Sequence, residues 1–325
     1  MHDILPYLKR AEKGPSGLSR DEIAALLAAD DPASEASLFA AARSVKESVG
    51  KTETLPRGLI ECSNVCAKDC LYCGIRKSSA SVRRYRLAEE EVRALVDEAR
   101  RRGYPAVAFQ AGEVESEANT SYYERLVAYA SPLEVTLSLG EQTEEVYRRW
   151  KAAGALRYLI RIETSNRELY AKLHPAECSY DRRLDCIRTL KRLGYVTGSG
   201  VMIGLPGQTV ADLADDIVFF GRERLDMVGM GPYIPHPDTP LGRGGETPPP
   251  LVGEPLLRLA LRMIAVTRLY LHGVNIVAAT ALEALDPAAG RVRGIAAGAN
   301  VVMPVLTPSE VRSGYDLYPG KVTAE

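Results

Sequence analysis

The sequence lacks the features that mark several large classes of protein. Its formal net charge is −1, so it has no general attraction to nucleic acid or to an anionic membrane. No stretch approaches the roughly 18–20 uninterrupted apolar residues that span a bilayer. The first residues, MHDILPYLKRAEKG, contain no apolar core of signal-peptide length. These absences predict a soluble, cytoplasmic protein without nucleic-acid or membrane partners.

Cysteine is scarce but concentrated. The 325 residues include six cysteines, and four of them fall in the stretch ECSNVCAKDCLYCG at 61–74. In a reducing compartment such clustering favours metal binding or catalysis over disulfides. The rest of the composition, with 46% hydrophobic and 26% charged residues, is ordinary for a globular enzyme.

The start of the chain and the remainder follow different patterns. Residues 1–50 are predicted to form a helical extension, because Ser19 and Glu22 have the spacing of a capping box ahead of an apolar helical stripe. Beyond this point, short apolar runs alternate with amphipathic segments such as 179–194. We therefore predict two parts, the helical extension and an α/β domain at 51–325.

Eight apolar runs are candidate strands. They lie at 58–64, 106–113, 133–140, 157–164, 197–206, 226–235, 273–280 and 300–308. Alternating strand and helix signals imply parallel strands with right-handed crossovers, and eight such strands close a (β/α)8 TIM-type barrel. A doubly wound open sheet is the alternative. It would need fewer strands, and a glycine-rich phosphate turn where the cysteine stretch stands.

A barrel predicts that the chemistry lies at the carboxyl ends of its strands. The unusual residues do fall there: Cys66, Cys70, Cys73, Gln110, Glu113, Thr136, Arg161, Glu163 and Thr280. An arginine that faces the barrel interior is costly unless an anion or a carboxylate pairs with it. Arg161 therefore indicates either an anionic ligand or an internal pair with Glu163.

Cys66, Cys70 and Cys73 have CxxxCxxC spacing. Three thiolates on one loop can ligate three irons of a cubane cluster and leave the fourth iron open. A closed zinc site would need a fourth ligand, usually from a second CxxC pair, and the sequence contains no such pair. Packing as small buried hydrophobic residues is the other alternative.

This spacing, with Tyr72 just before the last cysteine, resembles the signature of the radical S-adenosyl-L-methionine (SAM) superfamily. In that superfamily the open iron binds the amino and carboxylate groups of SAM, and one electron cleaves the C5′–S bond to give a 5′-deoxyadenosyl radical. The resemblance therefore implies a 4Fe–4S cluster and SAM as cofactors. A barrel interior would shield the radical from water.

Longer stretches resemble the iron–iron hydrogenase maturase family HydE. They run from about residue 50 to residue 321 and include GLIECSNVCAKDCLYCGIR, YLIRIETSN, GVMIGLPGQT, DMVGMGPYIPHPDTP, ANVVMPVLTP and YDLYPGK. Biotin synthase and the methylornithine synthase PylB share the architecture. The resemblance implies a radical that acts on an iron–cysteine complex with carbonyl and cyanide ligands while the hydrogenase diiron site is assembled. It also implies other hydrogenase maturases and a reductant protein as partners.

The resemblance assigns roles to individual residues as well. Cys66, Cys70 and Cys73 would hold the cluster. The residues implied to bind SAM are Tyr72, Gln110, Gly112, Glu113, Glu163, Arg183, Met202 and Ile203. Those implied to bind the anionic substrate are Arg57, Thr136, Arg161 and Thr280, and the catalytic residues facing it are Tyr315 and Tyr318. From the residues alone, a surface position for Arg183 and simple packing for the two tyrosines remain open.

Two departures from the HydE pattern matter. HydE usually has paired threonines where this chain reads Ala279-Thr280, so one pocket hydroxyl is absent. No cysteine follows Cys186, so we expect a single cluster. The alanine keeps open a radical SAM mutase or a sulfur-chemistry enzyme that acts on an amino acid or a small thioether. A non-catalytic iron–sulfur scaffold is a third hypothesis, against which the polar strand ends argue.

Overall fold

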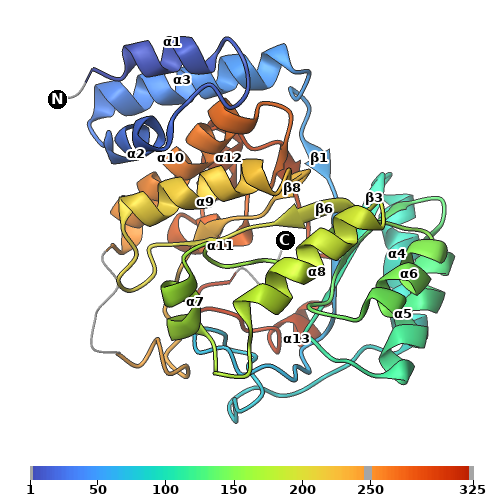
Figure 1. Ribbon diagram of the computed structural model, residues 1–325. Helices are drawn as coiled ribbons and strands as arrows, with labels where there is room; N and C mark the ends of the chain where they lie inside the picture. The colour runs from blue at the N-terminus through green and yellow to red at the C-terminus, as the bar shows by residue number, and fades with distance from the viewer. Residues whose placement is uncertain (1–2, 245–250, 322–325) are drawn as a thin grey trace.

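Parallel strands form the centre of the structure. The computed structural model describes residues 3–244 and 251–321 (Figure 1). Its strands are β1 (Leu55–Pro56), β2 (Gly58–Ser63), β3 (Ala106–Ala111), β4 (Glu134–Ser138), β5 (Ala155–Leu159), β6 (Val196–Ser199), β7 (Met202–Ile203), β8 (Met227–Val228), β9 (Gly231–Pro232), β10 (Asn275–Ile276) and β11 (Val301–Val302). Seven of them form one sheet in the order β10-β8-β6-β5-β4-β3-β2, and all its pairings are parallel.

The segment around β11 joins the two ends of this sheet. On one side the Leu59 amide donates to the Pro304 carbonyl at 2.7 Å, and on the other the Ala278 amide donates to the Val301 carbonyl at 2.9 Å. β11 also pairs in parallel with β1. These bonds close the ring, so the predicted (β/α)8 TIM-type barrel is confirmed. Two of the eight predicted strands are each divided, giving β6 and β7, and β8 and β9.

Alternate residues of the strands face the helices or the barrel interior, as the period of two requires. Ile60 and Phe109 belong to the main apolar core between strands and helices. Leu59 and Ala108 instead lie in a small separate cluster, which fills one level of the interior. The next inward position on β2 is Glu61, and it pairs in register with Gln110 of β3. The interior therefore becomes polar toward the carboxyl ends of the strands.

Helices surround the barrel (Figure 1). They are α1 (Leu5–Ala11), α2 (Arg20–Ala28), α3 (Pro32–Ser48), α4 (Glu89–Arg101), α5 (Glu117–Ala130), α6 (Glu144–Ala152), α7 (Arg167–Leu173), α8 (Tyr180–Arg192), α9 (Val210–Arg222), α10 (Gly253–Leu271), α11 (Thr280–Leu285), α12 (Gly290–Ala296) and α13 (Ser309–Arg312). The predicted helix at 179–194 is α8. It begins where the Ser179 hydroxyl accepts from the Arg182 amide, which satisfies one of the free amides of the first turn.

The first 50 residues are helical, as predicted. The Ser19 hydroxyl accepts from the Glu22 amide at 3.3 Å, and the Ser19 amide donates to Glu22 Oε2 at 2.8 Å, so the capping box is present. α2 packs on α9, and α3 packs on α10. Figure 1 shows α1, α2 and α3 on the outside of the barrel. Lys46 Nζ donates to the Ile295 carbonyl at 3.0 Å. The division into two parts near residue 50 stays a prediction.

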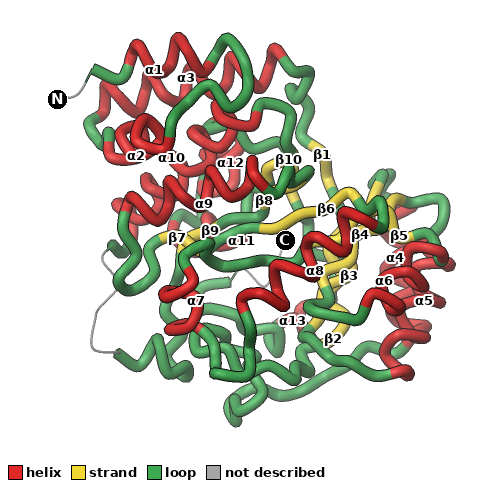
Figure 2. Tube along the Cα trace, in the orientation of Figure 1, coloured by secondary structure: helices red, strands yellow, loops and turns green. Residues whose placement is uncertain are grey.

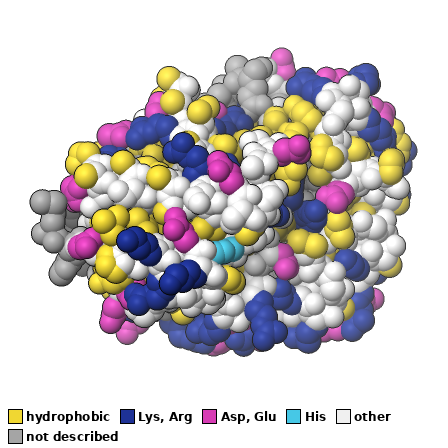
Figure 3. Space-filling model, turned by 90° about the horizontal axis from the view of Figure 1, so that it is seen from above, with side chains coloured by type: hydrophobic (Ala, Val, Ile, Leu, Met, Phe, Trp, Pro, Cys, Tyr) yellow, Lys and Arg dark blue, Asp and Glu magenta, His cyan; other side chains and the backbone are white. Residues whose placement is uncertain are grey.

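The outer surface carries charges of both signs. Figure 3 shows acidic and basic side chains interspersed over most of the face seen from above, with basic ones gathering along its lower edge. Within residues 3–244 and 251–321, no helix combines the length and the apolar character that crossing a membrane requires.

Candidate functional site

The cysteine loop follows β2 at the carboxyl end of the barrel, and Figure 2 shows the chain from β2 to α4 as irregular loop. Arg84 ties the two ends of this loop together, because its Nη1 donates to the carbonyls of Asn64 and Ile75 at 2.7 and 2.8 Å. Gly112, after β3, lies against the loop at Val65 and Cys66. A Cβ at Gly112 would lie 2.3 Å from the Val65 carbonyl oxygen. Only glycine permits this approach.

The three thiols of the loop are partly shielded from water. Burial raises the pKa of Cys66 and of Cys70, and it raises the pKa of Cys73 to about 12. The Cys66 sulfur accepts from the amides of Lys68 and Glu113, both at 3.4 Å, an arrangement that suits a thiolate bound to iron. In the described residues no three metal-binding side chains lie close enough to hold a single ion. Cysteines around a cubane are spaced by the cluster itself, so the loop fits the larger group.

Tyr72 points from the loop into a small apolar cluster. The cluster contains Met202 of β7 and Tyr233, and burial raises the pKa of Tyr72 well above its ordinary value. The Tyr72 hydroxyl lies 3.5 Å from Glu163 Oε1 and 3.5 Å from His174 Nε2. The structure thus brings together three predicted SAM-binding residues, Tyr72, Glu163 and Met202. Ile203 lies in the main core, and its predicted role stays a prediction.

A buried charge network stands beside the cysteine loop. Arg183 Nε donates to Glu141 Oε1 at 2.6 Å, and Lys68 Nζ lies 3.0 Å from Glu113 Oε1 and 3.3 Å from Glu141 Oε2. Burial raises the pKa of Glu113 in spite of these cations. Burial opposes ionisation of Glu141 too, but Arg183 and Lys68 together outweigh it and lower the Glu141 pKa. Arg183 is therefore a buried network residue, and its alternative surface position is wrong.

Sequence reasoning missed Glu141 and Lys68 as members of this network. Glu141 ends the stretch TLSLGE after β4, and it is 1% exposed. A glutamate directly after a predicted barrel strand was the available signal. Lys68 lies between two cysteines of the loop and carried no signal of its own.

Glu163 is held in an unusual backbone conformation. Its φ is +68°, in the left-handed region that side-chain-bearing residues rarely adopt. The Glu163 amide donates to the Gly200 carbonyl at 3.0 Å, and the Met202 amide donates to the Glu163 carbonyl at 2.9 Å. Its carboxylate pairs with Arg161 Nη2 at 2.7 Å. The predicted internal pair is thus present, and the strain sits at the strand end, where function is expected.

The barrel interior contains polar atoms without partners. Thr136 Oγ1 and Arg161 Nε are buried and have no hydrogen-bond partner in the described residues. Arg57 lies near the amino ends of the strands, where its Nη1 contacts Met227 Sδ at 3.2 Å. Burial and the charge of Arg157 lower the pKa of Arg57 to about 10, and the charge of Glu134 offsets this only in part. The interior thus contains the cations Arg57 and Arg161 together with the carboxylates of Glu61 and Glu163.

A segment near residue 318 covers this interior. The Tyr318 hydroxyl shares a hydrogen bond of 2.7 Å with Thr280 Oγ1, and burial raises the pKa of Tyr318 to about 12. Thr280 is the first residue of α11, so the prediction that it ends the strand is wrong: β10 ends at Ile276, and Thr280 follows it after a short connection. Tyr315 is 2% exposed, and Lys321 Nζ donates to its carbonyl at 2.8 Å.

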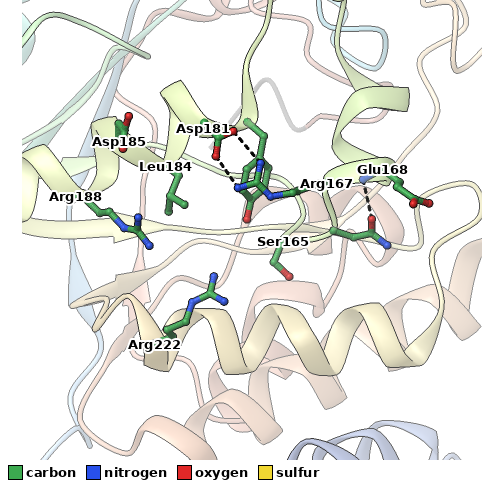
Figure 4. A pocket seen from close by; sticks show the side chains of 10 residues that line it. Ser165, Arg167, Glu168, Asp181, Leu184, Asp185, Arg188 and Arg222 are labelled. Atoms are coloured by element: carbon green, nitrogen blue, oxygen red, sulfur yellow. Dashed lines mark hydrogen bonds and ion pairs between the residues drawn. The ribbon is translucent and has the colours of Figure 1, made fainter.

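A surface hollow lies elsewhere. Its volume is about 790 Å³, and it is lined by Ser165 before α7 and by residues of α7, α8 and α9, including Arg167 and Asp181 (Figure 4). The close-up shows the guanidinium of Arg167 facing Asp181, and their nearest atoms are 2.6 Å apart. None of the predicted site residues lines this cavity. The candidate site is therefore the barrel interior together with the cysteine loop.

Known proteins with similar sequences belong to the radical SAM superfamily, which agrees with a three-cysteine loop at the end of a barrel. The model of the radical SAM superfamily matches residues 60–220. The FeFe hydrogenase maturase subunit HydE of Thermotoga maritima is 42% identical over 98% of this chain and 88% of its own length. A biotin synthase of Cutibacterium acnes is 30% identical over 57% of this chain and 52% of its own length.

Solved structures show the same fold at lower identity. HydG, a maturase of the FeFe hydrogenase, superposes with a TM-score of 0.82 at 20% identity, covering 98% of this chain and 72% of that chain. Methylornithine synthase PylB superposes with a TM-score of 0.80 at 23% identity, covering 91% of this chain and 85% of that chain. At such identities the likeness extends to architecture alone.

Proposed function

Because this chain belongs to the HydE family of radical SAM enzymes, we propose that it acts on an anionic iron complex with cysteine, carbonyl and cyanide ligands during hydrogenase assembly. The observation that carries the proposal is a set of interior polar groups without partners. Arg57 forms no ion pair within the described residues and contacts Met227 Sδ, and Arg161 Nε and Thr136 Oγ1 lack hydrogen-bond partners there. Such groups are costly to bury, and an anionic substrate would satisfy them.

Cys66, Cys70 and Cys73 would hold one 4Fe–4S cluster. The amides that donate to the Cys66 sulfur and the missing side chain at Gly112 leave the loop suited to it. When bound, the cluster supplies the electron that cleaves SAM. The single cluster is proposed because no cysteine follows Cys186 in the sequence.

Residues around the loop would position SAM. Glu163 offers its carboxylate beside Tyr72, and Arg183 and Glu113 form the charged wall of the same region. Met202 supplies an apolar surface for the adenine. The remaining residues that we assign to SAM are Gln110, Gly112 and Ile203.

The substrate would lie deeper in the interior. Arg57, Thr136 and Arg161 would orient it by charge and hydrogen bonding, and Thr280 would hold Tyr318 toward it. Tyr318 and Tyr315 would face the reacting sulfur as catalytic residues. Because both tyrosine hydroxyl pKa values are raised by burial, these groups stay protonated and can donate hydrogen bonds to an anion.

The test uses anaerobically reconstituted protein, SAM, dithionite and the synthetic iron–cysteine dicarbonyl cyanide complex. Samples frozen at successive times are examined by EPR, and the nucleoside products are then identified. We expect a new iron signal that depends on the complex, and adenosine joined to the cysteine sulfur. The matched variants are Cys70→Ala, which should cleave no SAM, and Arg192→Met on the outside of α8, which should behave as wild type.

A second function within radical SAM chemistry rests on Ala279. The Ala279 methyl lies 3.3 Å from where a Cβ on Gly231 would stand, so this wall offers no hydroxyl. A mutase or a sulfur-chemistry enzyme acting on an amino acid or a small thioether would suit a less polar wall. Release of free 5′-deoxyadenosine without a new iron signal would refute the maturase substrate and favour this alternative.

We also propose partners and a location. An iron complex of this kind must be delivered and handed on, so other hydrogenase maturases and a protein reductant are the expected partners. A reduced cluster requires a reducing compartment, which supports the cytoplasm.

A further inference from the structure

Arg312 is a buried arginine to which the proposed function gives no role. It ends α13 and is 2% exposed. Its Nε and Nη2 atoms are buried and have no hydrogen-bond partner in the described residues. These two atoms form one edge of the guanidinium, the edge that binds a carboxylate through two parallel hydrogen bonds.

The neighbouring cations are already paired. Lys321 Nζ lies 2.5 Å from Glu61 Oε1, and Arg161 Nη2 lies 2.7 Å from Glu163 Oε2. Arg312 lies on the same C-terminal segment as the two predicted site tyrosines, and the Tyr315 amide donates to the Arg312 carbonyl at 2.9 Å. Arg312, unlike Lys321 and Arg161, forms no ion pair with the described residues.

Burying a guanidinium without a partner is costly, and Nε and Nη2 of Arg312 find no hydrogen-bond partner in the described residues. A residue needed only for packing could be apolar at no loss. We propose that Arg312 binds the carboxylate of a ligand at the mouth of the barrel, next to Tyr318. In the proposed function this carboxylate is that of the cysteine on the iron complex, so the assignment of the ligand, but not of the site, rests on that function.

SAM also carries a carboxylate, and the structure distinguishes a site for the SAM carboxylate from a site for the substrate carboxylate. The charged network of Glu113, Glu141 and Arg183 lies beside the cysteine loop. Arg312 instead lies on the segment whose Tyr315 amide bonds its carbonyl and whose Tyr318 bonds Thr280 of α11. The position of Arg312 therefore favours the substrate carboxylate over that of SAM.

The test compares Arg312→Met, which keeps the volume, with Arg312→Lys, which keeps the charge but loses the planar edge. We expect Arg312→Met to raise KM for the iron complex at least tenfold, with a change of less than twofold in the Kd for SAM. Arg312→Lys should recover part of the affinity. Arg188→Met is the control, because that arginine is half-exposed and pairs with Glu223.

Thermal unfolding of the cluster-free protein supplies a readout that does not need activity. Arg312→Met should raise the unfolding temperature, because it removes an uncompensated buried charge. Acetate at constant ionic strength should stabilise the wild type more than chloride does, and this difference should vanish in Arg312→Met. A lowered unfolding temperature with no acetate effect in the wild type would show that Arg312 is structural and overturn the proposal.

The two proposals fail in different ways. If the Kd for SAM weakens while KM for the iron complex does not, the carboxylate belongs to SAM and the substrate assignment is overturned. If the wild type ignores the iron complex, the proposed function fails. The acetate effect and its loss in Arg312→Met then still decide whether Arg312 is a carboxylate site.

Discussion

The left-handed backbone conformation of Glu163 allows a test of whether this residue lowers the stability of the protein while it supports SAM binding. Two variants remove the same carboxylate and leave Arg161 equally without its partner, but they differ at the backbone. Glu163→Ala keeps a side chain at φ +68°, and Glu163→Gly relieves that conformation. The difference in unfolding free energy between the two variants therefore measures the cost of the left-handed backbone conformation at residue 163.

The expected difference can be worked out from the conformation. A side-chain-bearing residue in the left-handed region costs about 1–2 kcal/mol. Glycine also gains freedom in the unfolded chain, which offsets about 0.4–1 kcal/mol of the relief. Glu163→Gly should therefore be more stable than Glu163→Ala by roughly 1 kcal/mol, although glycine is normally the more destabilising residue.

Urea unfolding of the cluster-free proteins measures this difference, and equilibrium dialysis of reconstituted protein measures SAM binding. Both variants should bind SAM at least tenfold more weakly than wild type, since both lack the carboxylate near Tyr72. Glu163→Gln serves as a control for shape. The reasoning is refuted if the glycine variant is the less stable one, or if the alanine variant binds SAM normally.

Two further predictions concern burial and close packing. Burial raises the pKa of Asp216 to about 7, so folding favours its protonated form and this stability is lost as pH rises from about 4 to 7. At pH 8 the free energy of unfolding of Asp216→Asn should exceed that of wild type by up to about 4 kcal/mol. At pH 5 this difference should be smaller, and an equal difference at both pH values would contradict the raised pKa of Asp216. Gly112→Ala places a Cβ 2.3 Å from the Val65 carbonyl oxygen. It should displace the cysteine loop and lower the iron bound per chain, whereas Gly273→Ala, which meets nothing within 4 Å, should bind iron as wild type does.

The barrel could be predicted from the sequence because its signals are local. Each strand alternates between the main core, as at Ile60, and the interior, as at Leu59, and each is followed by a helix. The order of strands in a parallel barrel then follows from chain order. Cys66, Cys70 and Cys73 could be singled out for the same reason, since their spacing lies within one short loop.

What could not be predicted depends on distant residues meeting. Glu141 and Arg183 are 42 positions apart and meet at 2.6 Å, and no local pattern distinguishes that arginine from its exposed neighbour Arg182. Glu163 bonds Gly200, which lies between β6 and β7, and Met202 of β7, so its conformation depends on residues about 40 positions away. Arg312 stands in a short helix whose sequence reads as an ordinary polar turn.

The way the ring closes bears on the order of assembly during synthesis. The bonds that seal the barrel join Leu59 to Pro304 and Ala278 to Val301, so they need a segment that is made long after the cysteine loop. Contacts between residues so far apart in the chain form late, because a long loop must first be ordered. The cysteine loop, only a few residues beyond Leu59, leaves the ribosome while the barrel is still an open sheet. Iron and sulfide can therefore reach the thiols before the interior is enclosed.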